Sequence, residues 1–135
     1  MYEPTVNRNE SGQINGALIY IVDDEPMLLD LAAVILEPLG YRIKTFRDPE
    51  EALRAYKAAE PPPVLIITDY AMHAMTGMEL MEACRQIRPR QKVLLVSGTV
   101  GPDIFGDTTI KPDRFLGKPY QSKQLIDLVE DLMAQ

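Results

Sequence analysis

Four short apolar runs in the chain each end in residues that are able to do chemistry. The first run leads into Asp23-Asp24, the second into Asp69, the third into Ser97 and the last into Lys118. If the runs are strands of an open parallel sheet, their carboxyl ends point into one common crevice, where such folds bind ligands. A crevice with three carboxylates, one hydroxyl and one ammonium group suits a divalent metal ion together with a phosphoryl group.

Each of these residues also has a plainer interpretation. The adjacent carboxylates of Asp23 and Asp24 repel unless a cation lies between them, yet acidic residues also favour the start of a helix. Asp69 follows the most apolar run, so its charge needs a partner; it is either a metal ligand or a nucleophile that forms an acyl phosphate. Lys118 either holds a phosphate or is a surface lysine, and Ser97 either donates to a phosphoryl oxygen or caps a turn. Only the combination is specific.

The elements that must position these residues alternate regularly from Ala17 onward. Five strand-like stretches, 17–22, 41–46, 64–68, 93–96 and 115–117, alternate with helix-like stretches. That alternation predicts a doubly wound α/β fold with a five-stranded parallel sheet and helices on both faces. The second stretch is half polar, which favours a place at the edge of the sheet.

Helix signals bound the expected helices. The first should run from Pro26 to Gly40, the second should start at Asp48 as its cap, and the others should span about 78–87 and 122–133. The fourth crossing segment, 99–110, contains two glycines and several β-branched residues, which disfavour a helix. We expect a short or irregular fourth helix there; the alternative is an ordinary helix stabilised by packing.

Length, net charge and the apolar stretches of the sequence exclude several classes of protein. A chain of 135 residues is one domain, which we assign to 17–135, and residues 1–16 are expected to be a flexible leader or linker. The net charge of −6 argues against direct nucleic-acid binding. No apolar stretch is long enough to span a membrane and no signal peptide begins the chain, so we expect a cytoplasmic location.

Two further features of the sequence are assigned no chemistry. The single cysteine, Cys84, lies on an apolar helical stripe and is expected to pack in the core. The nearest approach to a basic cluster is expected to be a solvated helix end. It consists of Arg85, Arg88, Arg90 and Lys92.

With these residues in place, the chain resembles the receiver domain of the bacterial response-regulator family over 17–135. The resemblance rests on five motifs: Val22-Asp23-Asp24-Glu25, Asp69-Tyr70-Ala71-Met72, Gly77, Ser97-Gly98 and Phe115-Leu116-Gly117-Lys118-Pro119. It implies a flavodoxin-like strand order, 2-1-3-4-5. It also implies that the region of the fourth helix and the last strand and helix is the usual signalling face.

The resemblance also implies a role for each site residue. Asp69 would be the phosphoacceptor, and Mg²⁺, with Mn²⁺ as a substitute, would be bound by Asp69, by Asp24 directly, by Asp23 through water and by the backbone carbonyl of Ala71. Lys118 would bridge Asp69 and the phosphoryl group, and the Lys118–Pro119 peptide bond would be cis.

Two residues would carry the switch. The Ser97 hydroxyl would move toward the phosphoryl group, and Phe115 would rotate into the space opened near Gly98; the alternative is that Phe115 is a static core aromatic. His73 stands where many relatives have proline, and we expect a solvated side chain, the alternative being a group that modulates the pH dependence of the site.

The first helix offers two apolar stripes. The expected core stripe is Leu28, Leu31, Ala32, Ile35 and Leu39. Beside it lies a second stripe formed by Leu29, Ala33 and Leu36. This second stripe is either buried against the neighbouring helix or forms a patch for kinase docking or weak homodimerisation.

The favoured function is a phosphorylation-switched signalling module rather than a turnover enzyme. It would take its phosphoryl group from a histidine kinase or histidine phosphotransfer protein, promote only its own phosphorylation and dephosphorylation, and signal to an unknown downstream protein. Either it is free-standing or it belongs to a longer chain such as a hybrid sensor kinase. An aspartyl phosphatase would need an acid at position 71, and a nucleotide binder would want a glycine-rich first loop. A phosphorylation-independent interaction module remains the main alternative.

Overall fold

A single parallel sheet organises the molecule. The computed structural model describes residues 7–8, 14–98 and 110–135. In these residues the main sheet has five strands in the order β4-β3-β5-β6-β7, and all neighbours are parallel. The strands are β3 (Leu18–Val22), β4 (Arg42–Phe46), β5 (Leu65–Asp69), β6 (Lys92–Ser97) and β7 (Arg114–Gly117). Counted along the chain, this is the order 2-1-3-4-5, so the expected topology is confirmed, including the edge position of β4.

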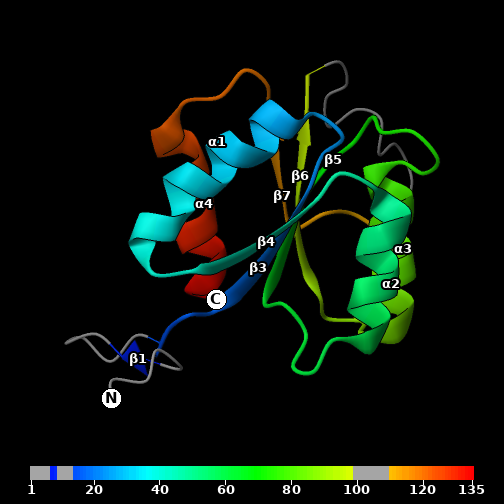
Figure 1. The fold of residues 1–135 in the computed structure, drawn as a ribbon, viewed down its shortest axis with the longest axis horizontal. Helices are drawn as coiled ribbons and strands as arrows, with labels where there is room; N and C mark the ends of the chain where they lie inside the picture. Colours follow the sequence, from blue (N-terminus) through cyan, green and yellow to red (C-terminus); the bar gives the residue numbers. More distant parts are fainter. Residues whose placement is uncertain (1–6, 9–13, 99–109) are drawn as a thin grey trace.

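Helices cover both faces of this sheet, as Figure 1 shows, which confirms the doubly wound fold. Helices α1 and α4 lie on one face and α2 and α3 on the other. The helices are α1 (Pro26–Leu36) with a 3-10 turn η1 (Glu37–Leu39), α2 (Pro49–Ala58), α3 (Gly77–Ile87) and α4 (Ser122–Met133). The prediction for a fourth crossing helix concerns 99–110, of which 99–109 lie outside the described residues. None of the described helices is long and apolar enough to cross a membrane.

The helix ends follow the local signals in the sequence. The side chain of Asp48 accepts a hydrogen bond from the Glu50 N–H at 2.9 Å and caps α2, as expected. Thr76 and Glu79 form a reciprocal capping box at the start of α3, which sequence reasoning missed. Gly40 ends η1 with φ of 102°, a left-handed conformation that glycine adopts without steric cost.

The segment before the domain contains a second, small sheet. Strands β1 (Asn7–Arg8) and β2 (Ile14–Asn15) pair antiparallel. Gly16 follows and is tied to the domain, because its N–H donates to the Gly40 carbonyl at 2.6 Å and its own carbonyl accepts from Arg42 Nε at 2.7 Å. The assignment of 1–16 as a leader or linker stays a prediction.

Alternate side chains of β3 enter two separate cores. Ile19 and Ile21 pack under α1 and α4, whereas Tyr20 and Val22 pack under α2 and α3. The second core also contains Cys84, which is buried as expected, and burial raises the pKa of its thiol to about 12. A thiol with that pKa stays protonated and unreactive near neutral pH.

The side of α1 that faces the core differs from the expectation. Leu29, Ala32 and Leu36 are its buried residues, so the second stripe is part of the core and is not a surface patch. Leu31 and Leu39, two members of the expected core stripe, are exposed. The helix is apolar around most of its circumference, so the 3.6-residue period could not define which stripe faces the sheet.

The expectation of a solvated basic cluster was also wrong for three of its four residues. Arg85 donates to the Lys111 carbonyl at 2.7 Å and to Asp113 Oδ2 at 2.8 Å, which links α3 to the start of β7. Arg88 lies over the ring of Tyr56, and Lys92 donates to two carbonyl oxygens at the end of α4. Their long aliphatic stems allow these cations to pack and still reach distant acceptors.

Candidate functional site

The four strand ends converge as the sequence analysis predicted. Asp69 and Ser97 are the last residues of β5 and β6, and Asp23 directly follows β3. The register pairs Asp69 with Val96 and Ser97 with Gly117, so neighbouring strands end almost level. Because parallel strands that end level present their next residues to one edge, the polar residues share a single crevice.

Three carboxylates form a tight cluster in this crevice. One oxygen each from Asp23, Asp24 and Asp69 lies within 4.8 Å of the others. Asp23 and Asp69 are buried, and Asp24 is half-buried. Asp23 is oriented by the Glu25 N–H, which donates to its Oδ1 at 2.9 Å. Hard oxygen atoms at this spacing are the donor set that Mg²⁺ prefers, so the residues fit a divalent cation.

Lys118 is the cation of the site. Its Nζ lies 3.0 Å from Asp69 Oδ1 and 3.3 Å from Asp23 Oδ2. The Lys118 N–H donates to the Ser97 carbonyl at 2.9 Å, and the following peptide bond to Pro119 is cis, the geometry that the resemblance implied. The segment that follows β7 therefore places one ammonium group between the carboxylates at the ends of β3 and β5.

Burial and charge act on the protonation of these groups in opposite ways. Burial raises the pKa of Asp69, the hydrogen bond from Lys118 opposes that rise, and the like charge of Asp23 adds to it, so the net direction is upward. Burial lowers the pKa of Lys118, but its hydrogen bond to Asp69 and the charges of Asp23 and Asp69 outweigh burial and raise it. The ammonium group of Lys118 balances one of the three carboxylate charges, and a divalent cation would balance the other two.

The turn after β5 approaches the site very closely. The Tyr70 N–H donates to the Val96 carbonyl at 2.8 Å, and the Gly77 N–H donates to the Tyr70 carbonyl at 2.9 Å. A Cβ atom on Gly77 would overlap the carbonyl oxygen of Asp69 and would lie 2.8 Å from Leu95 Cδ1. Glycine at this position therefore lets the start of α3 pack against the end of β5.

His73 lies in the same turn. Its side chain is 63% exposed, as expected for a solvated histidine, and its Nδ1 is 3.5 Å from Asp24 Oδ2. The imidazole is thus both exposed and close to the acid cluster, and its alternative role in the pH dependence of the site stays a prediction.

The two residues expected to switch lie on β6 and β7. Ser97 is buried and Phe115, on β7, is partly buried. Phe115 pairs in register with Leu95, and a Cβ atom on Gly98 would lie 3.4 Å from Lys118 Cβ. The positions suit the expected roles, and movement of either side chain stays a prediction.

Tyr120 is a site residue that the sequence analysis missed. It lines a cavity of about 20 Å³ beneath the cluster, together with Asp23, Asp69 and Lys118. Such a volume holds about one water molecule. Burial raises the pKa of its hydroxyl, while the charge of Lys118 lowers it. Its position immediately after the Lys118-Pro119 pair was the available signal.

The strand order 2-1-3-4-5 and the acid cluster paired with a lysine define a doubly wound α/β domain with a candidate metal site. Comparison with known proteins gives its family. The model of the response regulator receiver domain matches residues 19–130. The chain therefore belongs to the response-regulator receiver family, whose members are signalling modules.

Individual relatives agree with this assignment. The chain is 30% identical over 121 residues to the transcriptional regulatory protein GlrR of Escherichia coli, covering 88% of this chain and 27% of that protein. It is 32% identical over 114 residues to the nitrogen assimilation regulatory protein NtrX of Azorhizobium caulinodans, covering 83% of this chain and 25% of that protein. The chain thus spans about a quarter of the length of these curated relatives.

Solved structures show the same fold. A CheY-like receiver domain protein from Methanospirillum hungatei is 27% identical, with a TM-score of 0.79, over 89% of this chain and 96% of that chain. The response regulator protein TrrA from Thermotoga maritima, crystallised in complex with Mg²⁺ and BeF, is 26% identical, with a TM-score of 0.75, over 85% of this chain and 97% of that chain.

Proposed function

We propose that this receiver domain accepts a phosphoryl group on Asp69 in a Mg²⁺-dependent reaction, with a histidine kinase or histidine phosphotransfer protein as donor. One observation carries the proposal: Lys118 Nζ lies 3.0 Å from Asp69 Oδ1, inside a cluster of three carboxylates whose oxygens lie within 4.8 Å. This arrangement combines a nucleophile, a fixed cation and a set of hard metal ligands in one crevice.

The metal would be held by the acid cluster. Asp23, Asp24 and Asp69 would provide carboxylate oxygens, and the backbone carbonyl of Ala71 would add one more ligand, with Mn²⁺ as a substitute metal. When bound, Mg²⁺ would supply positive charge shared by the carboxylates and the phosphoryl oxygens. The structure of TrrA with Mg²⁺ and BeF supports this part of the proposal by analogy.

The chain's own residues would carry out the transfer. An Asp69 carboxylate oxygen attacks phosphorus and forms a new P–O bond, while the bond from phosphorus to the donor breaks and the donor leaves with its electron pair. Lys118 offsets the negative charge on the phosphoryl oxygens, a task that its short distance to Asp69 Oδ1 supports. The domain promotes its own phosphorylation and dephosphorylation and does not turn over a separate substrate.

The product would then change the shape of the domain. An aspartyl phosphate adds charge and acceptor oxygens, and the Ser97 hydroxyl would move to donate to one of them. Phe115, two strand positions from Gly117, would rotate into the space that this movement opens. An unknown downstream protein would recognise the new surface.

The exposed face of α1 offers a docking surface for the donor. Met27 is 78% exposed and Val34 is 66% exposed on this face. A cavity of about 360 Å³ beside it is lined by Leu31 of α1 and by Lys118 and the two residues that follow it. These apolar side chains adjoin Lys118, so they would hold a helix of the phosphoryl donor next to Asp69.

Intact mass spectrometry tests the proposed acceptor directly. The wild-type chain is incubated with acetyl phosphate and Mg²⁺, and the expected result is a gain of one phosphoryl group that EDTA prevents. Asp69→Asn should abolish the gain, and Asp127→Asn, a change at an exposed acid of α4, should preserve it. A gain that survives Asp69→Asn would contradict the acceptor assignment. No gain in the wild type would favour the phosphorylation-independent interaction module.

A further inference from the structure

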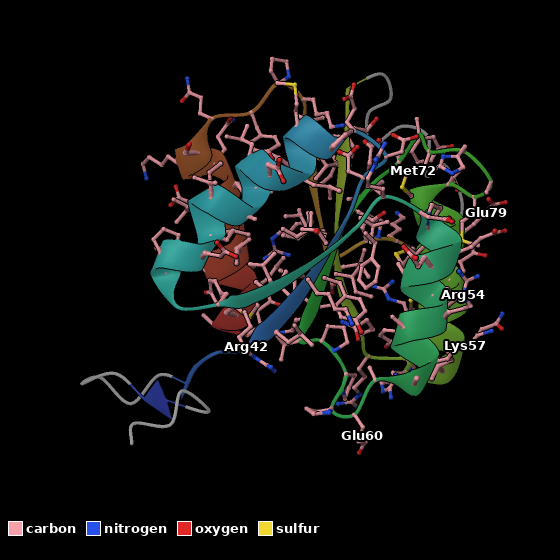
Figure 2. The ribbon with its side chains drawn as sticks, viewed as in Figure 1. Arg42, Arg54, Lys57, Glu60, Met72 and Glu79 are labelled. Atoms are coloured by element: carbon pink, nitrogen blue, oxygen red, sulfur yellow. The ribbon has the colours of Figure 1, made fainter. Side chains whose placement is uncertain are left out.

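A wide apolar groove lies at the amino-terminal end of the sheet, opposite the acid cluster. Its volume is about 790 Å³. It lies between the segment before β5, the turn from α3 to β6 and the end of α4, on the side of the molecule that Glu60 marks in Figure 2. Its apolar lining consists of Pro63, Val64, Ile87, Pro89 and Met133.

The groove is open to solvent along its length. Val64 is 44% exposed and Ile87 is 41% exposed, although both are large aliphatic residues. Sites for small molecules bury most of the ligand surface, and an open groove does not. An open apolar groove instead fits one side of a peptide chain, whose other side stays in water.

Three of the four polar residues that line the groove are cationic, the fourth being Gln91. Arg88, Arg90 and Lys92 line it, and no acidic residue does among the described part of the chain, although the net charge of the whole chain is −6. Arg90 is exposed and forms no ion pair with any of the described residues. Lys92 donates to the backbone oxygens of Leu132 and Gln135 at the end of α4.

Arg88 holds its charge in a fixed position. Its guanidinium carbon lies 4.8 Å from the centre of the Tyr56 ring, and its Nη2 donates to the Ala59 carbonyl at 3.3 Å. Its Nη1 is buried and has no hydrogen-bond partner among the described residues. This guanidinium forms no ion pair with any of the described residues, so a positive charge stays fixed on a residue that lines the groove.

We propose that this groove binds an acidic peptide segment of a partner protein. Aliphatic or aromatic side chains of the peptide fill the apolar floor, and its carboxylates face Arg88, Arg90 and Lys92. Because the groove and Asp69 lie at opposite ends of the strands, the peptide binds without displacing any residue of the acid cluster. The proposal is therefore independent of phosphorylation.

A library of random peptides tests the proposal while the partner is still unidentified. Peptides of 12 residues displayed on phage are selected against the full chain, and enriched peptides are synthesised with a fluorophore and measured by anisotropy. We expect enrichment of sequences that combine Asp or Glu with Leu, Ile or Phe. Arg90→Glu should weaken their binding about tenfold or more, and Val64→Ser should weaken it several-fold.

Matched variants separate the groove from general charge effects. Arg54→Glu makes the same charge change on α2, away from the groove (Figure 2), and should leave the affinity unchanged, as should Asp69→Asn. The proposal is overturned if no acidic peptide is enriched, or if Arg90→Glu and Arg54→Glu have equal effects. It is also overturned if sedimentation shows a homodimer that Arg90→Glu dissociates, because the groove would then be covered by a second copy.

Discussion

The two ends of the sheet use charged residues in opposite ways. At the carboxyl end, Lys118 is enclosed with carboxylates at 3.0 and 3.3 Å. At the amino end, Arg88 stacks on the Tyr56 ring, Lys92 donates to backbone oxygens, and both residues line an open apolar groove. Enclosed opposite charges tune one another's protonation, which is the requirement of a chemical site. Open cations beside apolar side chains are suited to recognition and not to reaction.

The largest expected effect is on the rate of labelling by acetyl phosphate, when a lysine is removed from either end of the sheet. Lys118→Met removes the cation beside Asp69, and we expect the rate of labelling by acetyl phosphate to fall about 100-fold, since a charge fixed at the reacting group is worth that much. Lys92→Met removes a cation of the amino end and should leave the rate unchanged. The measurement is the time course of the mass gain. Equal effects of the two changes would show that Lys118 acts only through net charge.

Close packing at the carboxyl end predicts the next largest effect. Gly77→Ala should lower the free energy of unfolding by about 2 kcal/mol, because the new methyl group overlaps the Asp69 carbonyl and Leu95 in a packed region. Gly98→Ala is the matched change, since its nearest neighbour is Lys118 Cβ at 3.4 Å, and it should cost under about 1 kcal/mol. Urea unfolding measures both. If Gly77→Ala were as stable as the wild type, the backbone of the turn after β5 would have shifted to accommodate the methyl group at little cost in free energy.

A change on the exposed face of α1 should slow phosphotransfer from a protein donor without changing the reaction with a small donor. Val34→Glu places a charge on the exposed face of α1, so we expect phosphotransfer from a cognate histidine donor to slow about tenfold, whereas labelling by acetyl phosphate stays unchanged. Gln86→Glu, at an exposed position of α3, is the control for one added negative charge. If Val34→Glu slowed both reactions equally, the change would be acting on the site itself.

The smallest effect concerns stability and pH. Folding raises the pKa of Asp69, so the stability that this group contributes is present below its ordinary value of 3.8 and is lost as the pH rises through the raised folded value. At pH 7, without divalent cations, Asp69→Asn should therefore increase the free energy of unfolding by about 1 kcal/mol. The gain should shrink as the pH falls toward 3.

Thermal unfolding at several pH values in EDTA checks this prediction. Adding Mg²⁺ should stabilise the wild type more than the variant, because the wild type offers the metal a third carboxylate. A variant less stable than the wild type at pH 7 would mean that the pair with Lys118 outweighs the burial of Asp69.

Much of the site could be read from the sequence because it depends on local order. A polar residue that directly follows an apolar run lies at the end of a strand wherever the strand packs, so the convergence of Asp23, Asp69, Ser97 and Lys118 needed only a parallel sheet. The same holds for α4, whose bounds matched because its apolar stripe and flanking residues all lie within the helix. Strand order came from the resemblance, because no local pattern carries it.

Contacts between distant segments were decided by the tertiary structure alone. The face of α1 that is buried depends on how the helix lies on β3 and α4, and its sequence is apolar on more than one side. Arg85 and Lys92 each donate to backbone oxygens 26 to 43 residues away, which no spacing rule connects. The close approach of Gly77 to Asp69 likewise follows from packing of α3 against the sheet. The sequence by itself determined which residues meet at the strand ends, since that is a matter of local backbone geometry; packing decided the distances, the burial and the pairing of charges.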